Sequence, residues 1–252
     1  LYVYENKYIL DLGFSIPEDL AADKPRKGQG VRESISYQYS LFEKATGVTE
    51  LFMKNNDINS SGDTSFTINK TGHLYITLNS SQPESITVKV NDNKVENFYD
   101  LKSHNRVIDV GYVNKEDKIS IESKTNLNAT AYIMDPDKLS QAVSKLNESG
   151  LKIESFSDTK IEGRFTTSSD SRYMFTIPYE EGWEVYVDGV KQETKESLGA
   201  FLSVNVSAGN HKIVLKYFPK GLKTGIAMSL ISVGILAVMI VVARRRKING
   251  GN

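Results

Sequence analysis

The sequence predicts a mainly β protein with two antiparallel β-sandwich (jelly-roll-like) domains, a short N-terminal helical segment and one C-terminal transmembrane helix. Apolar and polar residues alternate with a period of two from about residue 65 onward, between clusters of Asn, Asp, Ser and Gly. A helical repeat is confined to two short stretches, and one unbroken apolar run lies near the C-terminus. We therefore expect an N-terminal segment 1–60, a first β domain 61–135, a linker helix 136–150, a second β domain 151–219, a transmembrane helix 222–243 and a cytoplasmic tail 244–252.

Within the N-terminal segment, residues 33–47 are expected to form a short helix. Ile35, Tyr39 and Phe42 recur at helical spacing, and Gly47 is a residue type that commonly ends helices. Residues 21–30 are charged and contain Gly and Pro, which indicates a loop before this helix.

The two β domains contain a series of strand candidates. They are residues 74–78, 86–90, 107–110 and 119–121 in the first domain, and 160–166, 173–177, 183–187, 201–206 and 212–218 in the second. Asp188-Gly189 lies between two candidates and predicts a tight hairpin, because both residue types tolerate positive φ.

A short amphipathic helix is expected between the two domains. Asp135 can cap its first turn, Pro136 suits the first helical position, and Gly150 can end it. The apolar face of this helix consists of Leu139, Ala142, Val143 and Leu146.

The two β domains resemble copies of each other. Residues 73–78 match 172–177, 88–92 match 185–189, 108–110 match 202–204, and 118–121 match 212–215. Alternating strands also match one another by chance, but four matches in the same order favour a duplicated β domain.

The apolar run at residues 222–243 contains one charged residue, Lys223, and is followed at once by the basic residues 244–247. At about 1.5 Å per residue it is long enough to cross a ~30 Å hydrocarbon core, so we expect the lipid bilayer as a partner. The basic cluster predicts a cytoplasmic C-terminus and places residues 1–219 outside the cell. A tail-anchored protein with its globular part in the cytosol is the competing interpretation.

The composition excludes several classes of function. Acidic and basic residues are equal at 31 each, and no basic stripe outside the tail suggests nucleic acid as a partner. The chain has no cysteine, and its three histidines are far apart, so we expect no metal site and no cofactor. No motif indicates a catalytic residue: Glu180 and Glu181 are neighbours in a turn and cannot face one glycosidic bond from two sides.

One strand offers a candidate binding residue. Trp183, Val185 and Val187 share a strand face that is expected to pack in the core, so Tyr186 points the other way. Tyr186 is therefore the candidate for a surface contact, because aromatic rings can stack on sugars.

Residues 178–192 (PYEEGWEVYVDGVKQ) and 198–225 (LGAFLSVNVSAGNHKIVLKYFPKGLKTG), with the apolar run after them, resemble the C-terminal end of the YfhO-type bacterial membrane proteins. Residues 3–14 (VYENKYILDLGF) and 38–47 (QYSLFEKATG) resemble the segment after the membrane core of that family. The resemblance implies a multi-spanning parent protein, similar to C-type glycosyltransferases, whose N-terminal membrane domain is missing from this chain. The family's catalytic acid lies in that missing part, so none is carried over.

The resemblance also implies a role. We expect this chain to be accessory to glycosyl transfer from a lipid-linked sugar to a cell-surface polymer such as teichoic acid. The alternative is a non-catalytic, membrane-anchored surface module that binds wall polymer or a partner protein.

Overall fold

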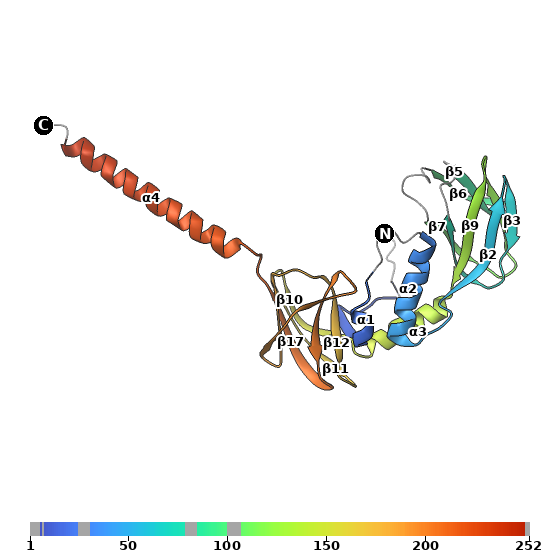
Figure 1. Ribbon diagram of the computed structural model, residues 1–252, viewed down its shortest axis with the longest axis horizontal. Coiled ribbons are helices and arrows are strands. Elements are labelled where there is room, and N and C mark those ends of the chain that lie inside the picture. The colour runs from blue at the N-terminus through green and yellow to red at the C-terminus, as the bar shows by residue number, and fades with distance from the viewer. Residues whose placement is uncertain (1–5, 7, 25–30, 79–84, 100–106, 250–252) are drawn as a thin grey trace, which may run out of the picture.

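The computed structural model describes residues 6, 8–24, 31–78, 85–99 and 107–249, and these form two β-sandwiches, three short helices and one long helix (Figure 1). The mainly β fold and the C-terminal apolar helix confirm the predicted fold class. Each sandwich has its own core of inward-facing aliphatic and aromatic side chains.

The first sandwich packs two four-stranded antiparallel sheets face to face. One sheet has the order β2 (Phe52–Ser60), β9 (Leu127–Met134), β4 (Gly72–Leu78) and β7 (Val107–Val113). The other has the order β3 (Thr64–Thr67), β8 (Lys118–Glu122), β5 (Ser85–Val90) and β6 (Asn93–Tyr99). The core between them is almost entirely Ile, Leu, Val and Ala.

The second sandwich packs a four-stranded sheet on a five-stranded one. The first has the order β1 (Gly13–Ile16), β12 (Ser171–Pro178), β16 (Phe201–Val206) and β15 (Lys195–Ser197). The second has the order β10 (Lys152–Ser157), β11 (Lys160–Thr167), β17 (Gly209–Tyr217), β13 (Trp183–Val187) and β14 (Val190–Gln192).

The sandwiches repeat each other's strand pairing and register. β4 pairs with β7 as β12 pairs with β16, and β8 pairs with β3 and β5 as β17 pairs with β11 and β13. In the sequence matches, Tyr75 corresponds to Met174 and Asp109 to Ser203. Tyr75 is aligned with Asp109 in the first sandwich, and Met174 is likewise aligned with Ser203 in the second. Val88 corresponds to Val185 and Ile121 to Leu215 in the same way. Val88 is aligned with Ile121, and Val185 is aligned with Leu215. Because register is preserved and not only strand order, chance similarity of alternating strands does not account for the repeat.

The repeat differs where the chain leaves each unit. In the first sandwich, β9 follows β8 and pairs beside β4. In the second, the chain leaves β17 for the C-terminal helix, and β1 from the N-terminus pairs in the corresponding place beside β12. The expected N-terminal segment 1–60 is therefore divided between the sandwiches, since β1 belongs to the second and β2 to the first. The expected boundaries differ from this arrangement because the strand at 13–16 is only four residues long and the strand at 52–60 is mostly polar, so neither shows a clear alternation.

Three helices cover the outer face of the sheet that contains β1. They are α1 (Glu18–Ala21), α2 (Val31–Thr46) and α3 (Pro136–Asn147). A third apolar cluster fills this contact, with Phe14 and Met174 from the sheet against Leu20 and Leu146 from the helices. As expected, α2 ends at a glycine with positive φ, and the Asp135 carboxylate caps α3 by accepting two backbone N–H bonds.

The fourth helix, α4 (Leu222–Asn249), extends away from the second sandwich (Figure 1). Its first 23 residues, Leu222–Arg244, are apolar enough and long enough to span a membrane, and none of that span is buried against the rest of the chain. The expected transmembrane segment and the observed helix therefore coincide.

Candidate functional site

No described helix or strand packs on the outer face of one sheet of the second sandwich. Helices α1–α3 pack on the sheet containing β1, whereas the outer side chains of β10, β11, β17, β13 and β14 are exposed or half-exposed. We call this outer surface the open face. It lies directly beside α4, because β17 is the strand that leads into this helix.

Basic side chains are opposed to one another across the open face. Lys152 is aligned with Arg164, which is aligned with Lys212 on the next strand. Four residues nearer α4, Lys160 is aligned with Lys216. We call these two sets, Lys152–Arg164–Lys212 and Lys160–Lys216, the basic rows. Like charges directly opposite each other destabilise a sheet, so the basic rows lower the stability of the folded protein unless other charges offset them.

Carboxylates partly compensate for these charges. Glu162 lies between the two rows and forms ion pairs with Lys160 and, at 3.8 Å, with Lys212. Arg164 Nε contacts Glu154 at 2.6 Å. The bond from Lys160 holds the pKa of Glu162 below its usual range. The strands of the open face carry six basic residues, Lys152, Lys160, Arg164, Lys191, Lys212 and Lys216, and three carboxylates, Glu154, Glu162 and Glu184. Asp11, from outside the sheet, pairs with Lys152, and the basic residues still outnumber these four carboxylates.

Tyr186 lies on this face, as its place in the strand predicts. Its hydroxyl donates a hydrogen bond of 2.9 Å to Glu184 Oε2, and Lys216 Nζ lies 5.0 Å from the centre of its ring. The bond to Glu184 raises the pKa of Tyr186 above its usual value, so the phenol remains a donor. A cation over a tyrosine ring is an attractive contact. Trp183, on the other face, is half-buried at the edge of the second core, and its ring centre lies 4.8 Å from that of Tyr217 with the planes tilted by 47°.

A groove of about 450 Å³ lies at the end of the open face farther from α4. The side chains of Lys152, Arg164 and Lys212 line it, together with Asn210 and His211. The carboxylates of Glu148 and Asp188 and the ring of Phe165 also line the groove, so it is of mixed charge, with basic side chains from three neighbouring strands at its wall.

His211 at this groove has acceptors on both ring nitrogens. Nδ1 lies 2.7 Å from Asp188 Oδ2, and Nε2 lies 3.0 Å from the Ser207 carbonyl oxygen. A neutral imidazole has only one N–H, so both contacts together require the protonated ring. The bond to Asp188 raises the pKa of His211, and the same bond lowers the pKa of Asp188.

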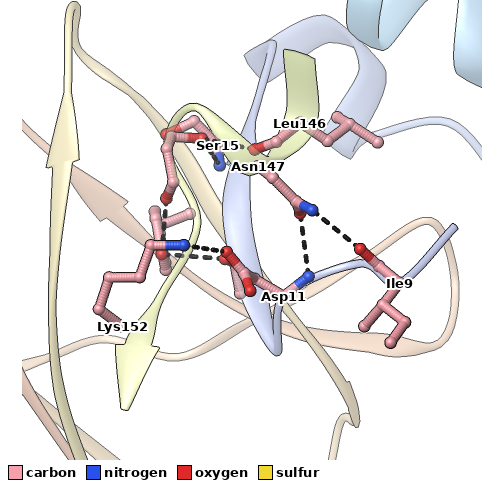
Figure 2. A network of polar contacts seen from close by, with 9 residues as sticks. Ile9, Asp11, Ser15, Leu146, Asn147 and Lys152 are labelled. Atoms are coloured by element: carbon pink, nitrogen blue, oxygen red, sulfur yellow. Dashed lines mark hydrogen bonds and ion pairs between the residues drawn. The ribbon is translucent and has the colours of Figure 1, made fainter. Parts of the chain in front are cut away.

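A polar network fixes the rim of the groove (Figure 2). The Asn147 side chain donates to the Ile9 carbonyl at 2.8 Å and accepts from the Asp11 N–H at 3.0 Å. Asp11 Oδ2 in turn receives a 2.8 Å bond from Lys152 Nζ. Gly150 has no room for a side chain here, because a Cβ would lie 1.8 Å from Asp11 Oδ2. The N-terminal segment, the end of α3 and the start of β10 are thereby held together.

The carboxylates singled out in the sequence have structural partners. Glu180 accepts a 2.6 Å hydrogen bond from the Tyr217 hydroxyl, and Glu181 forms an ion pair with Lys220.

Within the described ranges, no three His, Cys, Asp or Glu side chains gather as a metal site. The cross-strand basic rows were missed in the sequence, because residues 48 apart, such as Arg164 and Lys212, become neighbours only through strand pairing.

These features define a duplicated β-sandwich protein with a C-terminal membrane-spanning candidate and an open, basic sheet face. The model of a family described as bacterial membrane protein YfhO matches residues 1–229, and the chain belongs to this family. A relative named "Uncharacterized protein YfhO", from Bacillus subtilis (strain 168), is 36% identical over 80 residues. That match covers 32% of this chain and 9% of the relative, so it spans only a small part of the relative's length.

Solved structures give only distant likenesses. A conserved protein of unknown function, PA5104 from Pseudomonas aeruginosa PAO1, is 8% identical with a TM-score of 0.22, over 63% of this chain and 71% of that one. A GH2 beta-galacturonidase from Eisenbergiella tayi is 12% identical with a TM-score of 0.25, over 65% of this chain and 30% of that one. At such scores neither likeness bears on function.

Proposed function

We propose that this chain is the extracytoplasmic C-terminal part of a multi-pass YfhO-type protein, and that it positions an acceptor polymer for glycosyl transfer from a lipid-linked sugar. The transfer itself belongs to the membrane region of the parent protein. The observation that carries the proposal is the open face, whose central strand β17 bears Lys212 and Lys216 and leads directly into α4.

The charge of the open face supports an anionic polymer such as teichoic acid. Two pairs of like-charged residues, Arg164 with Lys212 and Lys160 with Lys216, face each other across β11 and β17. A bound anion would relieve their repulsion. The rows are four residues apart along the strands, about 13 Å, so a chain of repeated anionic groups could contact both at once.

Binding should depend on the open face and not on charge elsewhere. The duplication offers a matched control, because Lys118 of the first sandwich corresponds to Lys212 of the second. We expect Lys212→Glu to weaken binding of purified teichoic acid to the whole chain in detergent several-fold, and Lys118→Glu to leave it unchanged. Tyr186→Ala should also weaken binding. Equal affinities for all three variants and the parent chain would contradict the proposal.

The orientation is tested by labelling. The chain has no cysteine, so single cysteines at Ser168 and Asn252 can be reacted with an impermeant thiol reagent on intact cells. We expect labelling at position 168 and not at 252, since the basic residues after Ala243 favour a cytoplasmic C-terminus. The opposite pattern would place the sandwiches in the cytosol.

A surface module that binds a partner protein is the second candidate, and one feature favours it. On edge strand β10, Ile153 and Phe156 are 46% and 67% exposed, although they face the inner side of the sheet. Exposed apolar residues on an edge strand are typical of an interaction surface. Sugar transfer separates the candidates: the full-length protein should transfer sugar and the isolated chain should not, whereas a pure binding module would leave both inactive.

A further inference from the structure

We propose that the end of the second sandwich nearest α4 rests on the bilayer surface, so that the sandwich has a fixed pose and does not swing on a tether. The contact consists of the junction loop, residues 179–182, with Trp183 and Phe218. This inference rests on the proposed anchoring by α4.

The junction loop is bonded to the end of β17. The Phe218 N–H donates to the Gly182 carbonyl at 2.9 Å, and the Tyr217 hydroxyl donates to Glu180 at 2.6 Å. Lys220, beyond the strand, forms an ion pair with Glu181. The chain therefore remains attached to the sandwich up to the residues just before the helix.

Gly182 shows how close this contact is. A Cβ at that position would lie 2.7 Å from Tyr217 Cε2 and 2.8 Å from the Phe218 carbonyl oxygen. Only glycine allows the loop and the strand to approach so closely.

The link to the helix is short and is itself bonded. Three residues separate Phe218 from Leu222, and even fully extended they span only about 10 Å. The Leu222 N–H donates to the Pro219 carbonyl at 3.2 Å, and the Gly225 N–H donates to Gly221 at 2.8 Å. Lys223 Nζ lies 5.3 Å from the centre of the Phe218 ring, so the first turn of α4 contacts the end of the strand.

The length of α4 sets the depth of the junction loop. With Arg244 at one boundary, the twenty residues 224–243 fill about 30 Å of hydrocarbon. Lys223 then lies at the other boundary, and the residues before it lie in the headgroup layer, which is roughly 5–8 Å thick on each side. Phe218 and the bonded junction loop are thus within reach of the headgroups.

The side chains at this end suit such a contact. Tyr179 and Phe218 are 37% and 43% exposed, and Trp183 is half-buried beside them. Tryptophan and tyrosine concentrate at membrane interfaces, where lysines such as Lys220 can extend their charge toward water.

The experiment uses the whole chain in phosphatidylcholine vesicles that carry a nitroxide on the lipid headgroup. A fluorophore is attached to a single cysteine at Glu181 or, as the matched control, at Ser168. Lys160 lies at the end of β11 nearer the junction loop, and Ser168 follows Thr167 at the other end of that strand. Thr167 is seven residues beyond Lys160, which along a strand is about 23 Å, so the two labelled sites lie at opposite ends of the sheet. We expect several-fold stronger quenching at position 181 than at 168, and quenching of Trp183, the only tryptophan.

Sedimentation after a carbonate wash tests anchoring by α4 separately from the contact between the sandwich and the bilayer surface. Chains that wash off would overturn the anchoring and the inference together. Chains that resist washing but are quenched equally at both sites would overturn the inference alone.

A second variant tests the rigidity. Gly182→Ala should reduce the difference in quenching between the two sites, because the added Cβ separates the junction loop from β17. Gly62→Ala is the control, since a Cβ there meets nothing closer than 3.9 Å. An unchanged difference in Gly182→Ala would show that these contacts do not set the pose.

Discussion

The double hydrogen bonding of His211 leads to a prediction about pH. Both of its nitrogens face acceptors, Asp188 Oδ2 and the Ser207 carbonyl, so the folded protein favours the imidazolium form. From its place in β17, His211 thus connects the β13–β14 hairpin turn, at Asp188, with the turn that precedes β17, at Ser207. Deprotonation removes one of the two N–H donors and the charge that attracts Asp188.

The direction in which pH changes stability follows from the direction of each pKa shift. The folded pKa of His211 is raised above 6.5, so its stabilisation is complete below that pH and is lost as pH rises through the folded value. The folded pKa of Asp188 is lowered below 3.8. The stabilisation that the Asp188 carboxylate contributes is therefore complete above that pH and is lost as pH falls through the folded pKa. The pair is strongest between about pH 4 and 6.5.

The magnitude is modest because Asp188 is exposed. The Asp188 side chain is 52% accessible and that of His211 only 10%, which reduces the ion pair toward the surface range of roughly 0–1 kcal/mol. The hydrogen bond from the charged ring to the Ser207 carbonyl adds a similar amount, so we expect about 1–2 kcal/mol in total.

The assay is urea unfolding of the whole chain in detergent at about pH 6 and about pH 8.5. Trp183 fluorescence reports on the second sandwich, where that ring packs. The parent chain should lose about 1–2 kcal/mol of unfolding free energy at the higher pH, and His211→Gln should lose little. His73→Gln is the control, because His73 pairs with Asp109 in the first sandwich. The same pH dependence in His211→Gln as in the parent chain, or a His211 pKa at or below 6.5 by NMR, would refute the reasoning.

Three further predictions concern anchoring and stability. Ile235→Arg places a charge at mid-span, which costs roughly 2.5–3.5 kcal/mol on insertion scales, and should move the chain into the carbonate-soluble fraction; full retention in the membrane would exclude α4 as the sole anchor. Trp183→Ala should cost roughly 2 kcal/mol in urea unfolding followed by circular dichroism, since the ring is only half-buried, whereas Tyr186→Ala should cost under about 1 kcal/mol by the same readout. Equal losses would show that the two faces of β13 are assigned wrongly. Gly150→Ala should cost about 1–3 kcal/mol by displacing Asp11, and an unchanged melting temperature would argue against that close contact.

Several parts of this fold were predictable because they depend on local patterns. Strands such as β5 and β11 alternate in hydrophobicity because one face of each is buried, and α3 carries its own cap and apolar stripe. The duplication was also detectable, since each copy keeps the same order of strands. The turn at Asp188-Gly189 was identified from its residue types, and both residues have positive φ.

Other strands left no such pattern. Strand β9 is buried along most of its length, because it pairs on both sides and is covered on both faces, so its alternation disappears. Strand β2 is polar and lies at a sheet edge, where little burial is needed. A polar edge strand resembles a loop in sequence.

The sequence by itself determined the fold class, the apolar helix, the repeated unit and the outward direction of Tyr186. Only the tertiary structure decided that β1 completes the second sandwich and that Arg164 and Lys212 become neighbours. It also decided that His211 meets Asp188 and Ser207 at once. The physical reason is that hydrophobic periodicity specifies which face of a strand is buried, whereas the partner across each hydrogen-bonded edge depends on how distant segments pack.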